Sequence, residues 1–587
     1  MRWGILMKYK SLSKRILAFI ALSTVLISAV GCSGPAKKVD NTKSMSSDEK
    51  AAWEEAATTP YGKYPEPVTY TMGKMIGVNT NLPSDGKFAS DNYENNAYTR
   101  FVKGFYNIQH TDAFEATGGD NYNQKASMAI AGGDIPDVMI VDEATLRSLV
   151  ANDMIADLSD AYKNCASDEV KGRYNSYDGK VLDRATFDGK LMAIPDATID
   201  AGPNLLWLRQ DWMDSLGLSA PKTMSDIENI LTQFVEKDPG KNGAGKTIGL
   251  ALNKRVGGDY TGEFEVDNVF SLFGSYPRQW VKNSAGEVVY GSTTPETKKA
   301  LEGITSWYKK GLIDKEFPVR TDDDLRSIVI NNQSGAFFGA WWAGYNPLQD
   351  AYKVNSNIKW TPYVVPVDDQ GNVKMYTQNM ATHFVVVRKG YEHPEVVVKS
   401  FNARCGIKES DTPAAQTDEI KKLQADVNEA DKLGIDGSLY PVNIIVDYRD
   451  ACLRLYDTAN KYVNKEIKEE DIKDEYFKNV SKSCAQYLAD VAAGNKPKDS
   501  DYGNYVSRMQ GSPLMKSKNI VQIDPVFFGR TASMEQKWAN LEKQENEMYL
   551  KIITGEQSID YFDEFVKTWK STGGDDITKE VSDAAKK

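Results

Sequence analysis

The first 32 residues constrain this chain more than any other feature, because they decide which part of it folds and where. Residues 1–31 carry five basic side chains and no acidic one, and a mainly apolar run without charges extends from Ile16 to Val30. That run is short for a membrane-spanning helix but has the length of the apolar region of an export signal. We therefore predict that residues 1–31 are a signal peptide and that the remainder folds outside the cytoplasm.

The residues at the end of the apolar run predict a lipid anchor. Ala29, Val30 and Gly31 are small or short and precede Cys32, an arrangement that resembles the bacterial lipobox, in which the cysteine thiol is acylated and becomes the new first residue. A plain signal peptide with a cysteine at the cleavage point is the alternative. Two acyl chains give stable anchoring where one does not. We expect a lipoprotein on the extracellular face of a bacterial cytoplasmic membrane of the Gram-positive type, with residues 32–67 as a flexible, polar tether.

Composition limits the kind of protein that the chain after the signal peptide can form. The chain has 587 residues, which is too long for one ordinary domain. Its hydrophobic fraction of 41% is enough for a large core. Its formal net charge of -11 argues against nucleic acid as a partner, and three histidines argue against a histidine-built metal site. Four cysteines remain after Cys32, without a CxxC motif, and whether they pair is left open: Cys165, Cys405, Cys452 and Cys484.

Apolar runs alternate with helical patterns along the body. Val68–Val78 and Pro136–Val141 are predicted as strands, the second buried on both faces of a sheet. Helices are predicted to begin at Thr223, as a capping box with Asp226, and at Thr294, which precedes a proline. Further helices are predicted at 393–403, 535–553 and 559–569. Strands alternating with helices indicate an α/β fold.

Several motifs together resemble the family 1 extracellular solute-binding proteins, the capture subunits of carbohydrate ABC importers, and more narrowly the branch of LplA-like and alginate-oligosaccharide-binding lipoproteins. The resemblance spans about residues 68–580. The residues that carry it are Gly133-Asp134-Ile135-Pro136-Asp137, Asp188-Gly189-Lys190 followed by Pro195, the segment from Leu206 to Leu218, Gly335–Gly339, Lys551–Gly555 and Gly573-Gly574-Asp575. Read from the residues alone, these positions are structural: Arg209 and Asp211 are expected to form an ion pair, and Trp212 to lie in the core.

The resemblance implies a two-lobed, periplasmic-binding-protein-like α/β fold of type II, with lobes that are discontinuous in sequence and joined by hinge segments. We place one lobe at 68–186 plus 380–525 and the other at 187–379 plus 526–587. The implied function is capture of an oligosaccharide between the lobes and its delivery to an ABC permease, by a monomer and without a cofactor. An oligopeptide receptor of similar size, or a secreted carbohydrate-active enzyme, are the alternatives; no G-x-S-x-G, Walker A or HExxH motif occurs.

Relatives in this family often carry an EF-hand-like calcium loop after the helix that begins at Thr223. In this chain Asp238 and Asn242 stand in that loop, but Gly240 replaces the second carboxylate and Lys246 the third. Calcium requires six to eight oxygen ligands, several of them anionic, and a lysine opposes a dication. We predict a loop that keeps its shape without metal, with the Lys246 ammonium group in place of the ion.

A sugar site needs flat aromatic rings beside polar side chains. The strongest candidates follow the apolar Gly335–Gly339 run, and we expect the run to end where a crevice opens, with only one of its two adjacent tryptophans facing that crevice. A second group lies in a loop near residue 280, and polar residues follow other predicted strands and crossings. The full candidate set is Trp341, Trp342, Tyr345, Asn346, Trp280, Arg278, Asp196, Asp200, Asn204, Asn79, Asp142, Glu143, Gln378, Asn379 and His383.

Overall fold

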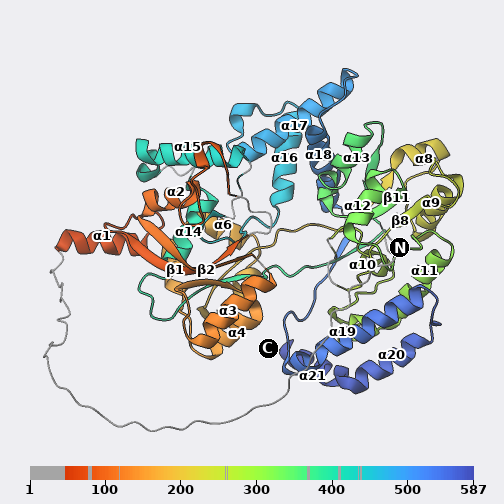
Figure 1. Ribbon diagram of the computed structural model, residues 1–587, viewed down its shortest axis with the longest axis horizontal. Helices are drawn as coiled ribbons and strands as arrows, with labels where there is room; N and C mark the ends of the chain where they lie inside the picture. Colours follow the sequence, from red (N-terminus) through yellow and green to blue (C-terminus); the bar gives the residue numbers. More distant parts are fainter. Residues whose placement is uncertain are drawn as a thin grey trace, which may run out of the picture. The chain divides into compact units, whose positions relative to one another are not determined.

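The structure is a computed structural model that describes residues 46–76, 82–117, 119–257, 260, 262–365, 371–407, 412–433, 435, 439–517 and 519–586. The chain divides into two compact units, residues 1–50 and residues 51–587. Of the first unit the structure describes residues 46–50, where helix α1 (Ser47–Thr58) begins. The elements of the second unit gather around two main groups of buried side chains (Figure 1).

The first core surrounds a five-stranded sheet in the order β2-β1-β3-β14-β6. β1 is parallel to β2 and β3, whereas β14 is antiparallel to β3 and β6. Its buried residues come from 56–197 and 381–446. The strands are β1 (Val68–Ile76), β2 (Ile108–Thr117), β3 (Val138–Val141), β6 (Ile194–Pro195) and β14 (Phe384–Val387), with a small hairpin of β4 (Thr186–Phe187) and β5 (Lys190–Leu191).

Helices of the first core flank these strands. They are α2 (Ala97–Tyr106), α3 (Asp120–Gly132), α4 (Glu143–Ala151), α5 (Ser159–Cys165), α6 (Asp168–Asn175), α7 (Lys180–Asp183), α14 (Val396–Cys405) and α15 (Asp418–Lys432), with short turns η1 (Gly86–Phe88) and η5 (Pro413–Gln416).

The second core surrounds a four-stranded sheet in the order β12-β7-β11-β8. β7 is antiparallel to both β12 and β11, and β11 is parallel to β8. The strands are β7 (Leu205–Arg209), β8 (Ile248–Ala251), β11 (Ser334–Gly339) and β12 (Trp360–Tyr363), and a separate hairpin joins β9 (Trp280–Lys282) to β10 (Val288–Tyr290).

Helices from two distant parts of the sequence cover the second core. The earlier set is α8 (Gln210–Leu216), α9 (Met224–Lys237), α10 (Asp267–Leu272), η2 (Gly291–Thr293), α11 (Pro295–Lys309), α12 (Asp322–Ile330), η3 (Trp341–Gly344) and α13 (Leu348–Val354). The later set is α19 (Ala532–Ile553), α20 (Tyr561–Trp569), η10 (Lys570–Gly574) and α21 (Asp575–Ala584).

A helical segment of residues 451–516 packs with the second core. In the sequence it lies between the later part of the first core and the later helices of the second core. It contains α16 (Ala451–Val463), η7 (Glu469–Asp471), α17 (Glu475–Ala492), α18 (Asp499–Tyr505), η8 (Val506–Gly511) and η9 (Ser512–Lys516). α18 contacts α13, and η8 contacts η3. The predicted domain boundaries put this segment in the first lobe; an amphipathic helix such as α16 can bury its apolar stripe against either core, and its pattern does not say which. The boundaries themselves stay a prediction.

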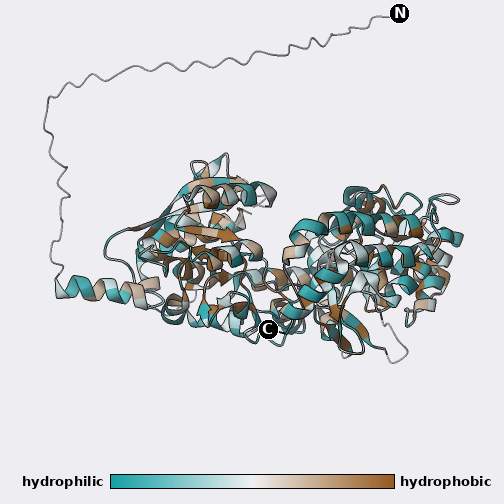
Figure 2. Cartoon of the chain, turned by 90° about the horizontal axis from the view of Figure 1, so that it is seen from below, coloured by the Kyte–Doolittle hydropathy of each residue, from teal (hydrophilic) through white to brown (hydrophobic). Residues whose placement is uncertain are grey.

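Most helices and strands expected from local patterns are present. α9 begins at a capping box of Thr223 and Asp226, and α11 begins after Thr294 with Pro295 in its first turn, as predicted. The buried strand β3 is also confirmed. β2 was not anticipated, because its alternating, half-polar residues at the edge of the sheet resemble a loop. Figure 2 shows hydrophobic residues concentrated in the interior strands and hydrophilic ones on the outer helices.

Two observations complete the description. Cys165, Cys405, Cys452 and Cys484 are all unpaired and buried. Among the described residues, no helix has both the length and the apolar character needed to span a membrane.

Candidate functional site

Strand ends of the first sheet gather several predicted site residues at one edge. Phe384, which begins β14, lies opposite both Val141, the last residue of β3, and Pro195, the last residue of β6. The residues next to these strand ends therefore meet at the same edge of the sheet. They include Asp142, Asp196 and His383.

The second sheet has a corresponding edge. Leu205, the first residue of β7, lies opposite Gly339, the last residue of β11. Asn204 and the η3 turn that begins at Trp341 are therefore neighbours at this edge. Residues 196–204 run directly from the first edge to the second.

Three chain segments connect the two cores, and they are hydrogen-bonded to one another. In the described part of the chain they are residues 196–204, residues 364–365 with 371–383, and residues 445–450. The first is bonded to the second by Thr198 N–H, which donates to the Met380 carbonyl at 2.8 Å, and to the third by Asp200 N–H, which donates to the Arg449 carbonyl at 2.9 Å. We call these three segments the crossings.

Asp196 fastens the first crossing to the second. Its carboxylate accepts hydrogen bonds from Thr382 N–H at 2.7 Å, from His383 N–H at 3.1 Å and from His383 Nδ1 at 2.9 Å. The bond to Asp196 raises the pKa of His383, whose side chain is 48% exposed. Asp196 is thus occupied in positioning the crossings.

A small pocket of about 60 Å³ lies among the crossings. Ile199, Asp200, Gln378 and Arg449 line it, and the Nε2 group of Gln378 is buried without a partner among the described residues. The volume suffices for one or two water molecules and is far below the roughly 300 Å³ at which small-molecule sites begin. The crossing pocket by itself therefore has room for water but not for a small molecule.

An aromatic cluster lies next to the crossing pocket. Trp341, Trp342 and Tyr345 of the η3 region pack with Cys452, and Ile199 contacts this group while also lining the pocket. The two tryptophans lie in a 3₁₀ turn, not in the strand continuation that the sequence suggested. Trp341 is 7% exposed, whereas Trp342 and Tyr345 are half-buried. The crossing pocket and the aromatic cluster together form what we call the crossing site.

Arg508 contacts two members of the aromatic cluster. Its guanidinium group lies 4.1 Å from the centre of the Trp341 ring, and its Nε donates to the Tyr345 hydroxyl at 3.0 Å. A second donor bonds the Tyr476 hydroxyl. Arg508 is 6% exposed, so the cation is stabilised mainly by aromatic faces and hydroxyl groups. Such support fixes the orientation of Tyr345 before any ligand arrives.

Two predicted residues lie elsewhere. Trp280 belongs to β9, is 4% exposed and packs against Tyr290 and Trp569 in the second core. The Arg278 guanidinium donates to the Gly257 carbonyl and to Asn546, and it approaches the buried Glu545 to 3.7 Å. The structure gives both side chains contacts within the second core and does not bring them to the crossing site.

The remaining predicted residues are mostly engaged in local hydrogen bonds. Asp142 caps α4 through Thr145 N–H, and Glu143 forms ion pairs with Arg147 and Arg184. Asn204 donates to the Gly262 carbonyl.

Asn379 accepts a hydrogen bond from Ala381 N–H, and Asn346 is half-buried just after η3. Asn79 lies outside the described residues.

The loop after α9 is closed by hydrogen bonds to Asp238. Its carboxylate accepts from the Thr247 hydroxyl at 2.6 Å, from Asn242 N–H at 2.9 Å and from Gly243 N–H at 2.8 Å, and the Thr247 bond contributes most to lowering the pKa of Asp238. The Lys246 side chain is exposed. Donor groups, not oxygen ligands, thus surround Asp238, and this donor set does not fit calcium.

Comparison with known proteins identifies the class. Residues 90–402, more than half of the chain, match the family of bacterial extracellular solute-binding proteins, and the chain belongs to that family. It is 22% identical over 479 residues to the polygalacturonan/rhamnogalacturonan-binding protein YtcQ of Bacillus subtilis, covering 79% of this chain and 83% of YtcQ. It is 28% identical over 221 residues to Lipoprotein LipO of Bacillus subtilis, but this match covers 37% of this chain and 41% of LipO's own length.

Solved structures show the fold. The alginate-binding protein AlgQ2, solved without calcium ion, superposes with a TM-score of 0.56 at 15% identity, covering 89% of this chain and 99% of AlgQ2. An HMO-binding, transporter-associated solute-binding protein from Bifidobacterium longum infantis gives the same TM-score of 0.56, the same identity of 15% and the same coverage of 89% and 99%. The fold is the two-lobed, type II periplasmic-binding-protein-like fold, as predicted.

Several residues of the crossing site were not anticipated from the sequence, among them two that line the pocket and one that supports the aromatic cluster. Tyr177 and Arg449 line the crossing pocket, and Arg508 supports the aromatic cluster. Arg449 follows a run of apolar and aromatic residues in the third crossing, a signal that could have indicated it. Arg508 carries no such signal, because it lies in the middle of a helical segment.

Proposed function

We propose that this protein captures an oligosaccharide at the crossing site and delivers it to the permease of an ABC importer. The observation that carries the proposal is the aromatic cluster: half-buried rings of Trp342 and Tyr345 at the end of β11, beside the polar side chains of the crossings. Rings that are already held in place offer a flat apolar face to the C–H side of a sugar, while carboxylate, amide and guanidinium groups serve its hydroxyls.

The relatives support a carbohydrate over a peptide. YtcQ is a polygalacturonan/rhamnogalacturonan-binding protein, and AlgQ2 is an alginate-binding protein. An extended peptide is bound mainly through main-chain hydrogen bonds, whereas the half-buried rings of the crossing site offer the apolar contact that a sugar ring needs. The family consists of binding proteins, and we infer that this chain releases its ligand chemically unchanged.

The membrane-proximal part of the proposal rests on the amino terminus. Export and acylation at Cys32 would leave a monomeric receptor tethered at the outer face of the cytoplasmic membrane by the residues between Cys32 and helix α1, where a permease is within reach. Residues 47–67, predicted as part of the tether, instead contain α1 and contribute the buried side chains of Ala56 and Tyr64 to the first core. Radiolabelled palmitate incorporation into the wild type, and its loss in Cys32→Ala, tests the anchor. Incorporation that persists in the variant would contradict it.

We further propose that binding requires no metal cofactor. Three hydrogen bonds to Asp238, the single carboxylate of this loop, close it without an ion. Calorimetric titration should therefore show no calcium binding. Micromolar binding that disappears in Asp238→Ala would overturn this part of the proposal.

Calorimetry with a panel of neutral plant and host oligosaccharides tests the main proposal. We expect 1:1 binding of at least one sugar, a loss of affinity of about 10-fold or more in Trp342→Ala, and an unchanged sugar on chromatography after incubation. Trp538→Ala is the matched control, because Trp538 is also half-buried but lies on α19 and packs against Tyr290. Tight binding of peptides alone, or formation of a sugar product, would refute the proposal.

A further inference from the structure

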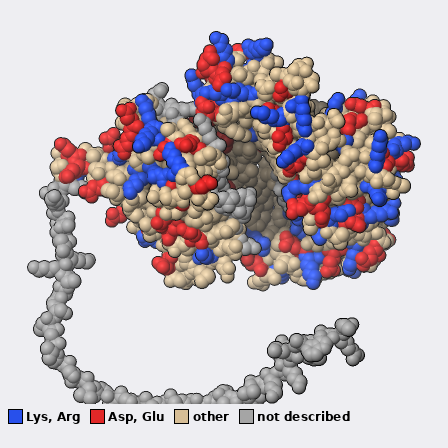
Figure 3. All heavy atoms as spheres, turned by 45° about the horizontal axis from the view of Figure 1, so that its top comes forward, with Lys and Arg blue, Asp and Glu red and all other residues tan. Residues whose placement is uncertain are grey.

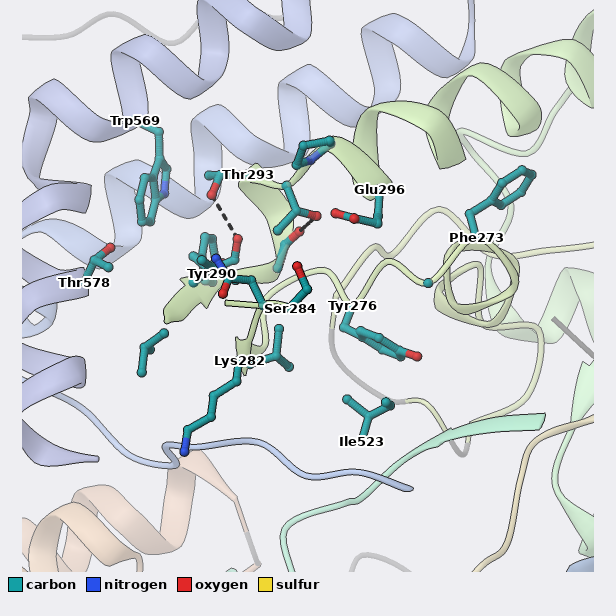
Figure 4. A pocket seen from close by; sticks show the side chains of 18 of the residues that line it. Phe273, Tyr276, Lys282, Ser284, Tyr290, Thr293, Glu296, Ile523, Trp569 and Thr578 are labelled. Carbon is teal, nitrogen blue, oxygen red and sulfur yellow. Dashed lines mark hydrogen bonds between the residues drawn. The ribbon is translucent and has the colours of Figure 1, made fainter. Parts of the chain in front are cut away.

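The second core contains a cavity of about 670 Å³ that is separate from the crossing site. It lies beside the β9–β10 hairpin, with α21 and the start of α11 on its other sides. Figure 4 shows Trp569 and Thr578 on one side, Tyr276 and Ile523 on the other, and Tyr290 and Thr293 between them. Its volume falls within the range of small-molecule sites, roughly 300–1,000 Å³. We call it the C-terminal cavity.

The wall of this cavity is aromatic and hydroxyl-rich. Trp569 and Tyr290 stack with ring centres 4.9 Å apart and planes within 6°, which makes a rigid apolar surface. The indole N–H of Trp569 and the hydroxyl of Tyr276 have no hydrogen-bond partner among the described residues. Thr293, Thr294, Thr578 and Ser284 add hydroxyl groups. Because Trp569 and Tyr290 are 1% and 2% exposed, the hydroxyl groups, and not the ring faces, are what a sugar in this cavity would meet.

Basic side chains outnumber acidic ones around this cavity. Lys282, Lys374 and Lys570 all line it, and within the described part of the chain none of them forms an ion pair. Two carboxylates, Glu296 and Asp575, line it as well, so positive groups outnumber negative ones although the whole chain carries a net charge of -11. On the face drawn in Figure 3 basic and acidic side chains are intermingled.

Lys374 is placed at the cavity by the backbone. It lies on β13 (Val373–Tyr376) and is half-buried, and its ammonium group approaches Gly274 so closely that a Cβ there would lie 3.4 Å from Nζ. Gly274 has a φ of +74°, a conformation that favours glycine. The absence of a side chain at this position leaves room for the ammonium group beside the cavity.

A two-stranded ribbon separates the C-terminal cavity from the crossing pocket. β13 pairs in parallel with β15 (Ile520–Ile523), and side chains alternate between the two faces of the ribbon. Lys374 and Ile523 line the C-terminal cavity, whereas the paired residues Met375 and Gln522 line the crossing pocket. Ligands at the two sites would therefore contact different residues.

We propose that the C-terminal cavity is a second binding site, for a sugar that carries an anionic group. The hydroxyl groups of Thr293, Thr294 and Thr578 would accept hydrogen bonds from the hydroxyls of the ring, and the ammonium groups of Lys282 and Lys374 would bind a carboxylate or a phosphate as point charges. Glu296 and Asp575 accept hydrogen bonds from hydroxyls. The inference goes beyond the proposed function, which concerns the crossing site alone.

Calorimetric titration with galacturonic acid, its neutral methyl ester and galactose 6-phosphate tests the proposal on the wild-type protein. We expect at least one of the two anions to bind about 10-fold or more tightly than the ester, and this affinity to fall about 10-fold in Lys374→Met and in Lys282→Met. Binding of galacturonic acid assigns the anion as a carboxylate, and binding of galactose 6-phosphate assigns it as a phosphate.

Two controls make the outcome decisive. Lys299→Met removes an exposed lysine on α11 outside the cavity and should leave the affinity unchanged. Trp342→Ala alters the crossing site and should also leave it unchanged. No binding of either anion, equal binding of the ester, or binding that is lost in Trp342→Ala but kept in both lysine variants would overturn the proposal. Circular dichroism spectra of the lysine variants check that they fold.

Discussion

The two aromatic groups of the second core look alike in sequence but differ in surroundings. Trp280 and Tyr290 lie on a hairpin, and α19 to α21, from the far end of the chain, complete their cover with Trp569. Trp341, Trp342 and Tyr345 lie on a 3₁₀ turn at the end of β11, where the crossings leave the sheet. The first group is enclosed by one core, whereas the second is half open beside segments that join two cores.

Under the proposed function, this difference separates aromatic residues that stabilise the fold from those that contact a ligand. A fully enclosed ring contributes through the apolar surface that it removes from water, and its removal leaves a cavity. A half-open ring contributes less to stability and keeps a face for a ligand. The comparison therefore predicts opposite consequences for stability and for binding when the two groups are mutated.

Trp280→Ala should give the largest effect on stability. The side chain is 4% exposed and packs on two further rings, so its loss should lower the free energy of unfolding by about 3–5 kcal/mol. Denaturant unfolding measures this change, with Trp342→Ala as the comparison and an expected loss of less than half as much. Equal losses in the two variants would show that the groups do not differ as described.

Two carboxylates show the same contrast: Asp196 fastens the crossings, whereas Asp238 closes a loop away from them. Asp238→Ala tests this contrast. Asp238 holds a loop within the second core through three hydrogen bonds, and its replacement leaves their donors unpaired, so we expect a loss of about 2 kcal/mol in unfolding free energy. Sugar affinity should not change, because neither Asp238 nor its hydrogen-bond partners line the crossing pocket or belong to the aromatic cluster. A variant that keeps full stability would mean that the loop is held by other groups.

The secondary structure of this chain was largely predictable, because its signals are local. The capping residues Thr223 and Thr294 and the apolar run of β3 need no information from elsewhere. The ion pair of Arg209 and Asp211, with N–O distance 2.6 Å, and the burial of Trp212 were also predicted and are confirmed.

The candidate site was only partly predictable, because its members are brought together by pairing across long sequence separations. Trp280 stood in a loop-like segment with a proline and an arginine, and nothing nearby indicated that Trp569 would cover it. Arg278 likewise meets Glu545 from α19. The Trp341 and Trp342 pair was found because it follows a buried strand, but Arg508, which supports it, had no local signal.

Arg508→Met tests whether the half-open aromatic group takes part in sugar binding. Methionine fills much of the same space, so the aromatic cluster should stay packed, but the Tyr345 hydroxyl loses its donor and the Trp341 ring its cation. We expect sugar affinity to fall about 3- to 10-fold, or roughly 1 kcal/mol. Arg147→Met is the matched control, since its guanidinium group also lies over a ring, that of Phe187, in the first core. Equal loss of affinity in both variants would argue against a specific role.

The smallest expected effect is a pH dependence at the crossings. The hydrogen bond to Asp196 raises the pKa of His383 in the folded protein above its unfolded value of about 6.5, and Asp142 adds to this. A raised pKa stabilises the fold fully below the unfolded pKa, and this contribution is lost as the pH rises through the folded pKa. Because the ring is half exposed, we expect only a few tenths of a kcal/mol, roughly, after solvent screening.

Denaturant unfolding of the wild type and His383→Gln near pH 5.5 and near pH 8.5, about one unit below and two above the unfolded pKa, measures this dependence. The difference in unfolding free energy between the two proteins should be larger at the lower pH and should vanish in an Asp196→Asn background. A difference that is the same at both pH values would mean that the charge on His383 does not help to hold the crossings together. Trp280→Ala, by contrast, removes no titratable group, so its cost should be independent of pH in this range, and the pH dependence thereby distinguishes the crossings from the enclosed core.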